Sequence, residues 1–183
     1  MKTSTVSTLA PLLLAMTLIN CSPPEPVAVP VVAEQKPLLV FLVRHAEKVD
    51  DSQDPELSEA GRERAATLAE ALRSADIEYV HSSDYIRTRN TATPSATEHG
   101  LEVEVYDPRD LPALAEKLRA AGGRHLVIGH SNTTPAMVEL LGGDAGAEID
   151  EPGEYDRLYV VSIGRDGLAN SVMMRYGKAY YSE

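Results

Sequence analysis

Residues 38–45 of the chain read Leu-Leu-Val-Phe-Leu-Val-Arg-His. The first six of them are all apolar, which predicts a strand that is buried on both faces of its sheet. Arg44 and His45 follow at once, at the carboxyl end of that strand. A strand of this kind needs cover on both sides of the sheet, so the stretch already favours an α/β architecture.

The rest of the chain alternates between helical and strand patterns. Apolar spacing predicts helices over about residues 59–74, 85–98, 111–121 and 134–141. Short apolar or alternating runs predict strands at 77–81, 102–106, 126–128, 158–163 and 171–176. This alternation predicts a three-layer α/β/α sandwich with a mostly parallel central sheet, occupying residues 38–183 as one domain.

Chemically active residues follow four of the predicted strands. Arg44 and His45 follow the first strand, residues 82–87 follow the second, Asp107 follows the third and His130 follows the fourth. Ligands of parallel α/β sheets bind beyond the carboxyl ends of the strands. We therefore expect these side chains to converge on one rim of the sheet.

Two histidines and two arginines at one rim suit phosphate chemistry. The guanidinium groups of Arg44 and Arg87 offer planar forks of donors that match phosphate oxygens. A neutral imidazole can attack phosphorus to give a phosphohistidine, which water then hydrolyses. The second histidine, when protonated, stabilises charge on the transferring oxygens. A carboxylic acid nearby would protonate the leaving oxygen.

Four segments, in this order, resemble motifs of the histidine phosphatase superfamily, in the branch that contains the phosphoglycerate mutases. They are Arg-His-Ala-Glu at 44–47, Leu-Ser-Glu-Ala-Gly at 57–61, Ser-Ser-Asp-Tyr-Ile-Arg-Thr at 82–88 with Thr91 continuing the pattern, and Val-Ile-Gly-His-Ser at 127–131. The resemblance covers about residues 38–176 and implies a phosphoglycerate mutase-like fold.

The resemblance also implies the roles of the matching residues. His45 is the residue that is phosphorylated, Arg44 and Arg87 bind the phosphoryl oxygens, and His130 is the second histidine of the pocket. Ser131 and Glu47 complete the predicted set of phosphate contacts. The family needs no metal, and we expect no cofactor.

The general acid stays open at this point. Asp107 is nearest to the position at which family members often carry a glutamate, and Asp110 and Glu47 are rivals. Relatives that act on good leaving groups manage without a dedicated acid. Two residues depart from the family pattern: Ala46 replaces a glycine, which would cost strain at a positive φ, and Lys48 replaces a small hydroxyl residue.

Three other histidines serve as controls. We expect His81 to be held by a hydrogen bond near the rim, and His99 and His125, which flank turns, to be exposed.

The function that fits best is hydrolysis of a phosphomonoester or phosphoramidate through His45. Phosphoglycerate-mutase-type transfer and a non-catalytic envelope module that binds phosphorylated ligands are the alternatives.

The charge balance narrows the partners. Seventeen Lys and Arg residues against 28 Asp and Glu residues give a formal net charge of −11, which disfavours broad electrostatic binding of nucleic acid. The expected partner is a small phosphorylated substrate or a phosphoprotein. Any phosphate site must be a local positive cluster on an acidic surface.

The N-terminus predicts export. The apolar run at 9–19 is short for a membrane span and has the shape of a secretory signal. Leu-Ile-Asn-Cys-Ser at 18–22 resembles the lipobox of bacterial lipoproteins, a resemblance that implies lipid on Cys21. Asn20 departs from the small residue that the family prefers there. An ordinary cleaved signal and an uncleaved anchor are the alternatives. Residues 22–37 are rich in proline and predict an extended tether, so we expect a membrane-anchored lipoprotein on the periplasmic side of the cell envelope.

Overall fold

The computed structural model describes residues 36–181. The signal peptide predicted at residues 1–21, Cys21 and nearly all of the tether predicted at 22–37 lie outside the described residues. Within 36–181, no helix is long and apolar enough to cross a membrane.

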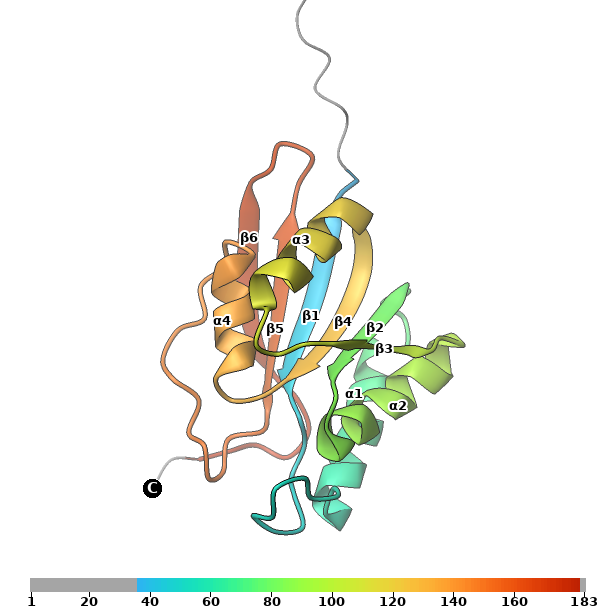
Figure 1. Cartoon of the computed structure of the whole chain (residues 1–183), viewed down its shortest axis with the longest axis vertical. Helices are drawn as coiled ribbons and strands as arrows, with labels where there is room; N and C mark the ends of the chain where they lie inside the picture. Colours follow the sequence, from blue (N-terminus) through green and yellow to red (C-terminus); the bar gives the residue numbers. More distant parts are fainter. Residues whose placement is uncertain (1–35, 182–183) are drawn as a thin grey trace, which may run out of the picture. The chain divides into compact units, whose positions relative to one another are not determined.

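Strands and helices alternate along the described residues, as Figure 1 shows. In chain order the elements are β1 (Leu38–Arg44), α1 (Glu59–Leu72), β2 (Tyr79–Ser83), α2 (Ile86–His99), β3 (Val103–Tyr106), α3 (Leu111–Ala121), β4 (Gly123–Gly129), α4 (Thr133–Leu140), β5 (Arg157–Ile163) and β6 (Ala169–Arg175).

One sheet organises the domain, with the strand order β3-β2-β4-β1-β5-β6. The first four strands along the chain run parallel, and β1 pairs with β4 on one side and antiparallel with β5 on the other. β6 pairs antiparallel with β5 and forms one edge. The mostly parallel sheet that the sequence predicts is confirmed, and the apolar stretch at 38–43 lies at its centre.

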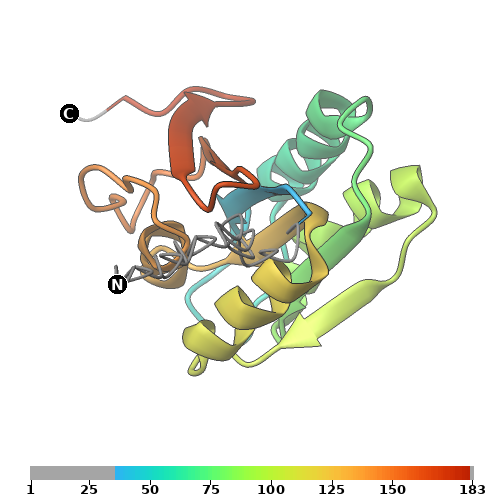
Figure 2. The ribbon, with the colours of Figure 1, turned by 90° about the horizontal axis from the view of Figure 1, so that it is seen from above.

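The two faces of β1 pack into different cores, because successive side chains of a strand point to opposite sides. Leu38, Val40 and Leu42 pack with α3 and α4, whereas Phe41 and Val43 pack with α1 and α2. Viewed from above, α1 and α2 lie on one side of the sheet and α3 and α4 on the other (Figure 2). The three-layer α/β/α sandwich is confirmed.

Polar caps set the ends of the helices that flank the rim. The Ser58 hydroxyl accepts a hydrogen bond from the Gly61 amide at 3.1 Å, and the Asp110 carboxylate accepts one from the Ala113 amide at 3.1 Å. These caps satisfy amides in the first turns of α1 and α3 that have no partner within the helix. Asp110, a rival for the acid, is thus used as a helix cap.

The strand boundaries differ from the sequence prediction by one to three residues, and two of the differences bear on the site. The second strand is Tyr79–Ser83 and not 77–81, because the polar side chains of His81 and Ser83 find hydrogen-bond partners inside the fold. The fourth strand runs from Gly123 to Gly129 and is longer than 126–128, because every residue of β1 pairs with one in β4. The polar residues and glycines at these strand ends are of types common in loops, but in this fold they belong to the sheet.

Candidate active site

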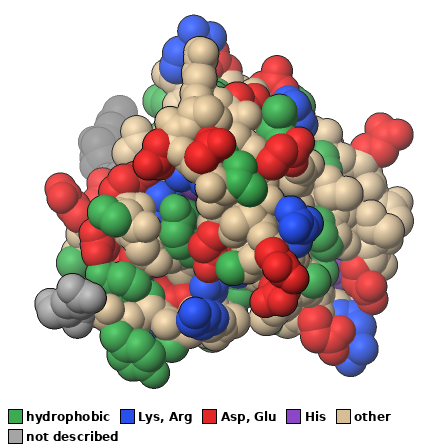
Figure 3. Space-filling model, turned by 90° about the horizontal axis from the view of Figure 1, so that it is seen from below, with side chains coloured by type: hydrophobic (Ala, Val, Ile, Leu, Met, Phe, Trp, Pro, Cys, Tyr) green, Lys and Arg blue, Asp and Glu red, His purple; other side chains and the backbone are tan. Residues whose placement is uncertain are grey.

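The carboxyl ends of β1, β2 and β4 surround a cavity of about 390 Å³. It is lined by His45, Lys48, Tyr85, Arg87, Pro108, Arg109, His130, Ser131, Asn132, Thr133 and Glu151. The predicted convergence on one rim is therefore present in the structure for His45, Arg87, His130 and Ser131. Viewed from below, onto this end of the sheet, the molecule shows many acidic side chains with a few basic ones among them (Figure 3).

His45 is held in one tautomer. Its side chain is 3% exposed, and its Nδ1 lies 2.8 Å from the carbonyl oxygen of Ala46. A carbonyl only accepts, so Nδ1 carries the proton and Nε2 keeps its lone pair. Burial lowers the pKa of His45 to about 3, and the neighbouring cations Arg44 and Arg87 act in the same direction. At neutral pH this imidazole is uncharged, as an attacking nitrogen must be.

Arg44 is a buried cation with spare donors. Its Nη1 donates to the carbonyl oxygen of Glu154 at 3.2 Å, while Nε and Nη2 are buried without a hydrogen bond among the described residues. Nη2 does lie 3.0 Å from a carboxylate oxygen of Glu151, an ion pair that lacks hydrogen-bond geometry. Burial lowers the pKa of Arg44. A buried guanidinium with unsatisfied donors destabilises the folded protein unless a ligand accepts hydrogen bonds from those donors.

Arg87 repeats this pattern from the first turn of α2. Its Nε is also buried without a hydrogen bond within residues 36–181, and its Nη1 lies 3.5 Å from a carboxylate oxygen of Asp54. Both guanidinium groups lie over tyrosine rings, Arg44 at 4.1 Å from the Tyr155 centroid and Arg87 at 4.4 Å from the Tyr85 centroid. Stacking fixes the plane of each fork, which is what recognition of a phosphate by several oxygens requires.

His130 faces His45, with the ring centroids 5.5 Å apart and the planes 68° from parallel. Its Nε2 lies 2.8 Å from the Ser83 hydroxyl. That hydroxyl donates to Thr88 Oγ1 at 3.1 Å, and Thr88 in turn donates to main-chain carbonyls, so Ser83 accepts from His130. Burial, with Arg87 and Arg44 adding to it, lowers the pKa of His130 to about 4.

Packing also fixes the backbone around His45. The Ala46 amide donates to Thr91 Oγ1 at 3.0 Å, and the Ala46 side chain is fully buried with Leu57 and Ala65. Ala46 has no positive φ, so its replacement of the family glycine costs no backbone strain. A Cβ on Gly61 would lie 2.2 Å from the Glu47 carbonyl oxygen, which explains the glycine that ends the Leu-Ser-Glu-Ala-Gly segment.

Gly129 allows the close approach that places His130. A Cβ at this position would lie 2.8 Å from Thr133 Oγ1 and 2.9 Å from Thr134 Oγ1. Thr133 accepts from the His130 amide at 2.9 Å, and Thr134 donates to the Val43 carbonyl at 3.2 Å. The two threonines thereby tie the ends of β1 and β4 together beneath the cavity.

The carboxylates predicted as phosphate contact or acid are engaged elsewhere. Glu47 forms a bidentate pair with Arg64, with Nε and Nη2 at 2.8–3.0 Å from its oxygens. Asp107 forms a bidentate pair with Arg109, and hydrogen bonds from Arg109 hold the pKa of Asp107 below its usual range. Neither carboxylate lines the cavity. An exposed, ionised Asp107 is poorly suited to donate a proton at neutral pH.

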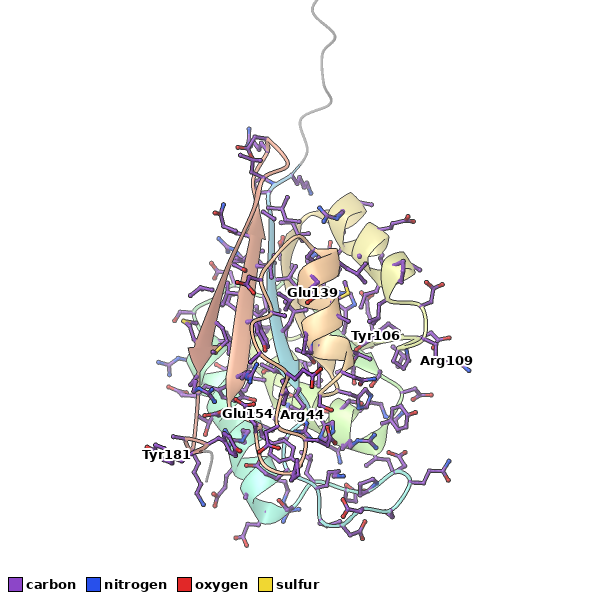
Figure 4. All side chains as sticks on the ribbon, turned by 90° about the vertical axis from the view of Figure 1, so that its left-hand side faces the viewer. Arg44, Tyr106, Arg109, Glu139, Glu154 and Tyr181 are labelled. Atoms are coloured by element: carbon purple, nitrogen blue, oxygen red, sulfur yellow. The ribbon has the colours of Figure 1, made fainter. Side chains whose placement is uncertain are left out.

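Sequence reasoning missed three contributors to the site: Tyr85, Tyr155 and Glu151. Tyr85 lies inside the recognised segment at 82–88, but only the structure shows it beneath Arg87 and 5.0 Å from the His130 ring. Tyr155 and Glu151 come from the loop between α4 and β5, which carries no recognisable motif. In Figure 4, Arg44 and Glu154 of this loop lie together, and Arg109 extends to the periphery.

The control histidines differ in part from expectation. His81 is buried and hydrogen-bonded, with its Nε2 2.9 Å from His125 Nδ1, as predicted. The expectation that His125 is exposed is wrong: it is 1% exposed, and its Nε2 donates to the Gly122 carbonyl at 2.9 Å.

Lys48 lines the cavity and pairs with Asp51 at 2.9 Å. Within residues 36–181, no group of three or more His, Cys, Asp or Glu side chains is placed to hold a metal ion.

Comparison with known proteins agrees with this geometry. Residues 40–116 match the family model of the histidine phosphatase superfamily, branch 1. No curated protein matches the chain. The matched segment covers less than half of the chain and contains Arg44, His45 and Arg87.

Solved structures with similar folds share little sequence with the chain. They include the protein histidine phosphatase SixA in complex with tungstate, at 19% identity over 76% of this chain and 96% of that one, with a TM-score of 0.58. A mycobacterial glucosyl-3-phosphoglycerate phosphatase has 15% identity over 79% and 100%, with a TM-score of 0.59. A phosphoglycerate mutase from Bacillus anthracis has 15% identity over 77% and 94%, with a TM-score of 0.58. At these identities the likeness establishes the fold.

Proposed function

We propose that this chain, whose residues 40–116 match the histidine phosphatase superfamily, hydrolyses a phosphomonoester or phosphoramidate through a phosphohistidine on His45. The observation that carries the proposal is the state of His45. Its Nδ1 proton is committed to the Ala46 carbonyl, so the Nε2 lone pair is free. The cavity is lined by Arg87, and Arg44 lies behind the lining residue Glu151; both arginines have spare donors.

The reaction has two steps. Nε2 of His45 attacks phosphorus while the unsatisfied donors of Arg44 and Arg87 bind phosphoryl oxygens, and the leaving group departs. Water then attacks the phosphohistidine and returns His45 to its starting state. His130 is neutral in the free protein, and a phosphoryl dianion beside it favours its protonated form, which donates to the transferring oxygens.

Catalysis fits the site better than simple binding. Arginines and main-chain amides are enough to hold a phosphate, and such a site needs no buried imidazole with its lone pair freed by a tautomer-fixing hydrogen bond. Phosphoryl transfer to a second hydroxyl, as in a mutase, uses the same first step and differs only in the acceptor. Release of inorganic phosphate shows that water is the acceptor and distinguishes hydrolysis from transfer to a hydroxyl.

A substrate panel tests the proposal. It contains aryl and alkyl phosphates, phosphoglycerates, a phosphorylated sugar and a phosphohistidine-bearing protein, assayed with wild type, His45→Ala and His99→Ala. His99 contacts the Leu72 carbonyl away from the cavity and is the matched control. We expect wild type and His99→Ala to release inorganic phosphate, and His45→Ala to lose at least about a thousandfold. Equal activity of His45→Ala and wild type would overturn the proposal.

We also propose, from the sequence alone, that the domain acts at the bacterial cell envelope and is tethered through lipid on Cys21. The support is the signal-like run at 9–19 and the lipobox-like segment at 18–22. Fractionation of cells that express wild type or Cys21→Ala tests this. Wild type is expected in the membrane fraction and the variant in the soluble envelope fraction. Wild type in the cytoplasm would contradict export.

A further inference from the structure

Glu151 brings a carboxylate into the catalytic cavity from outside the recognised motifs. Its side chain lines the same cavity as His45, Arg87 and His130. One of its oxygens lies 3.0 Å from Arg44 Nη2, although the side chain is 61% exposed. Glu151 is also close enough to His130 to work against the lowering of the pKa of that histidine by burial.

The backbone that carries Glu151 is fixed on both sides. The Asp150 amide donates to the buried Glu154 carboxylate at 2.9 Å, and the Glu154 amide donates to the Asp150 carbonyl at 2.9 Å. The Asp150 carboxylate accepts a hydrogen bond from the Tyr180 hydroxyl. The turn is therefore anchored, whereas the described contact of the Glu151 carboxylate is its ion pair with Arg44.

Glu151 has no carboxylate competitor among the residues that line the cavity; Asp54, near Arg87, does not line it and accepts from the Ile86 amide at 2.8 Å. Glu47 is paired with Arg64, Asp107 is paired with Arg109 and Asp110 caps α3. Among the residues described as lining the cavity, Glu151 alone carries a carboxyl group.

We propose that Glu151 is the general acid of the phosphoryl transfer, an assignment that rests on the proposed phosphatase function. In the first step the His45 Nε2 lone pair forms the N–P bond, the bond from phosphorus to the leaving oxygen breaks, and the Glu151 carboxylic acid gives its proton to that oxygen. In the second step the Glu151 carboxylate takes a proton from the attacking water as the N–P bond breaks. The cycle ends with inorganic phosphate, neutral His45 and protonated Glu151, which gives its proton to water when phosphate leaves and the ion pair with Arg44 forms again.

Substrate binding itself supplies the proton donor. In the free protein Glu151 occupies the side of Arg44 that carries the unsatisfied donors. A phosphoryl group that binds to those donors displaces the carboxylate from its cation and places a dianion beside it. Both changes favour uptake by the carboxylate of a proton, which water supplies. Glu151 is thus ion-paired while the site is empty and becomes able to protonate a leaving group once the site is filled.

The test is the dependence of rate on the leaving group in Glu151→Gln. The substrates are p-nitrophenyl phosphate, whose leaving group needs no proton, and a series of phenyl and alkyl phosphates with progressively more basic leaving groups. We expect kcat/KM for p-nitrophenyl phosphate to stay within about threefold of wild type. For alkyl phosphates we expect a loss on the order of a hundredfold or more, the usual contribution of general acid catalysis.

Two matched controls sharpen the result. Glu148→Gln removes the same charge from the same loop at a position that does not line the catalytic cavity, and Asp107→Asn removes the acid that the sequence favours. Neither is expected to steepen the dependence on the leaving group. Circular dichroism and the melting temperature check that Glu151→Gln is folded, and activity on p-nitrophenyl phosphate checks that its site is intact.

Other outcomes overturn the assignment. Equal loss of activity on all leaving groups, or no loss, would exclude Glu151 as the acid. Tighter inhibition by inorganic phosphate with an unchanged dependence on the leaving group would make Glu151 only an occupant of the anion site. In both cases hydrolysis through His45 would stand. A wild type that hydrolyses no member of the panel would instead contradict the proposed function.

Discussion

Two clusters of charge lie side by side at the same end of the sheet and are built in opposite ways. The catalytic group consists of Arg44, His45, Arg87 and His130, and the carboxylate cluster consists of Glu154, Asp156, Arg157 and Arg175. Strand pairing makes them neighbours, because Val43 is opposite Leu158 and Arg157 is opposite Arg175. Arg44 belongs to the catalytic group and also contacts the carboxylate cluster, because it donates a hydrogen bond to the main-chain carbonyl of Glu154.

The carboxylate cluster is fully matched. Arg157 forms a bidentate pair with Glu154 at 2.7 and 2.8 Å, and Arg175 contacts Glu154 at 2.9 Å and Asp156 at 2.5 Å. Burial alone would raise the pKa of Glu154, but hydrogen bonds from Arg157, the Asp150 amide and Arg175 outweigh it and lower the pKa to about 2. In the catalytic group, buried guanidinium nitrogens have no such partners among the described residues.

The difference separates stability from ligand binding. In the carboxylate cluster every charge has a partner, and these ion pairs hold the loop between α4 and β5 in place. In the catalytic group the unpaired guanidinium donors can bind an anion from outside the protein. Exchange of one arginine in each cluster should therefore have opposite consequences for unfolding and for catalysis.

The largest effect on stability is expected for Arg157→Met. The change leaves Glu154 buried with fewer cations, which typically costs about 3–5 kcal/mol in the free energy of unfolding. Urea unfolding measures this value. Activity of the folded fraction should fall less than tenfold, because Arg157 does not line the cavity. A change below about 1 kcal/mol would show that the cluster does not hold the loop.

Arg44→Met is expected to do the reverse. It removes donors for the phosphoryl oxygens, so kcat/KM should fall on the order of a hundredfold or more. The free energy of unfolding should change much less than in Arg157→Met, because the lost cation had unmet donors. Steady-state kinetics and urea unfolding of the two variants, run together, give the comparison. Equal destabilisation by both substitutions would contradict it.

The activity of wild type should persist in acid. An attacking histidine loses its lone pair when it is protonated, so kcat/KM falls as the pH drops through its pKa. With the pKa of His45 at about 3, the fall should begin only below about pH 4, and protonation of His130 does not add to it because that protonated form donates to the phosphoryl oxygens. Histidines with an ordinary pKa near 6.5 would already lose roughly thirtyfold at pH 5. A pH profile, corrected for substrate ionisation, with a midpoint near 6.5 would rule out a buried neutral pair.

The carboxylate cluster should make stability pH-dependent in the same direction. The pKa of Glu154 is lower in the folded protein than its model value of 4.5. Its contribution is therefore fully present above pH 4.5 and is lost as the pH falls from 4.5 towards 2. Urea unfolding of wild type and Glu154→Gln across this range measures it. The two curves should converge in acid, and parallel curves would contradict the pairing.

The smallest effect is expected for Ser83→Ala. The Ser83 hydroxyl accepts from His130 and orients its ring, and loss of one such hydrogen bond is worth about 1 kcal/mol, or up to about tenfold in kcat. The pH dependence of kcat should shift together with its value, because the lost hydrogen bond bears on the protonation of His130. Ser82→Ala is the matched control on the same strand, since Ser82 donates to the Ser83 carbonyl and has no described bond to a histidine. A purely structural role of Ser83 would change stability without moving the profile.

Much of this architecture could be predicted from the sequence. The run at 38–43 predicts a central strand because a strand buried on both faces carries no polar alternation, and His45, Arg87 and His130 follow strands whose ends meet. The predicted boundaries of β2 were wrong because polar residues lie inside the sheet there. His81 and Ser83 are typical of loops in the sequence, and only their hydrogen-bond partners explain their place in a strand.

The supporting residues could not be predicted for a physical reason. Tyr155 and Glu151 reach the cavity through a loop whose path is set by the Glu154 ion pairs, and no local pattern encodes such long-range contacts. Asp107 has the position expected of an acid in the sequence, but its neighbour Arg109 captures its carboxylate. The Asp107–Arg109 pair depends on the conformation of the turn at 107–110, which the order of residues in the sequence does not reveal.

Rapid quench with a phosphoryl-labelled substrate measures whether a phosphoryl group is carried on His45 during turnover. Wild type is expected to acquire an acid-labile, alkali-stable label that maps to His45 and that forms and decays at rates compatible with turnover. His45→Ala should acquire no label. Steady hydrolysis by wild type without a label on His45 at any quench time would contradict the account.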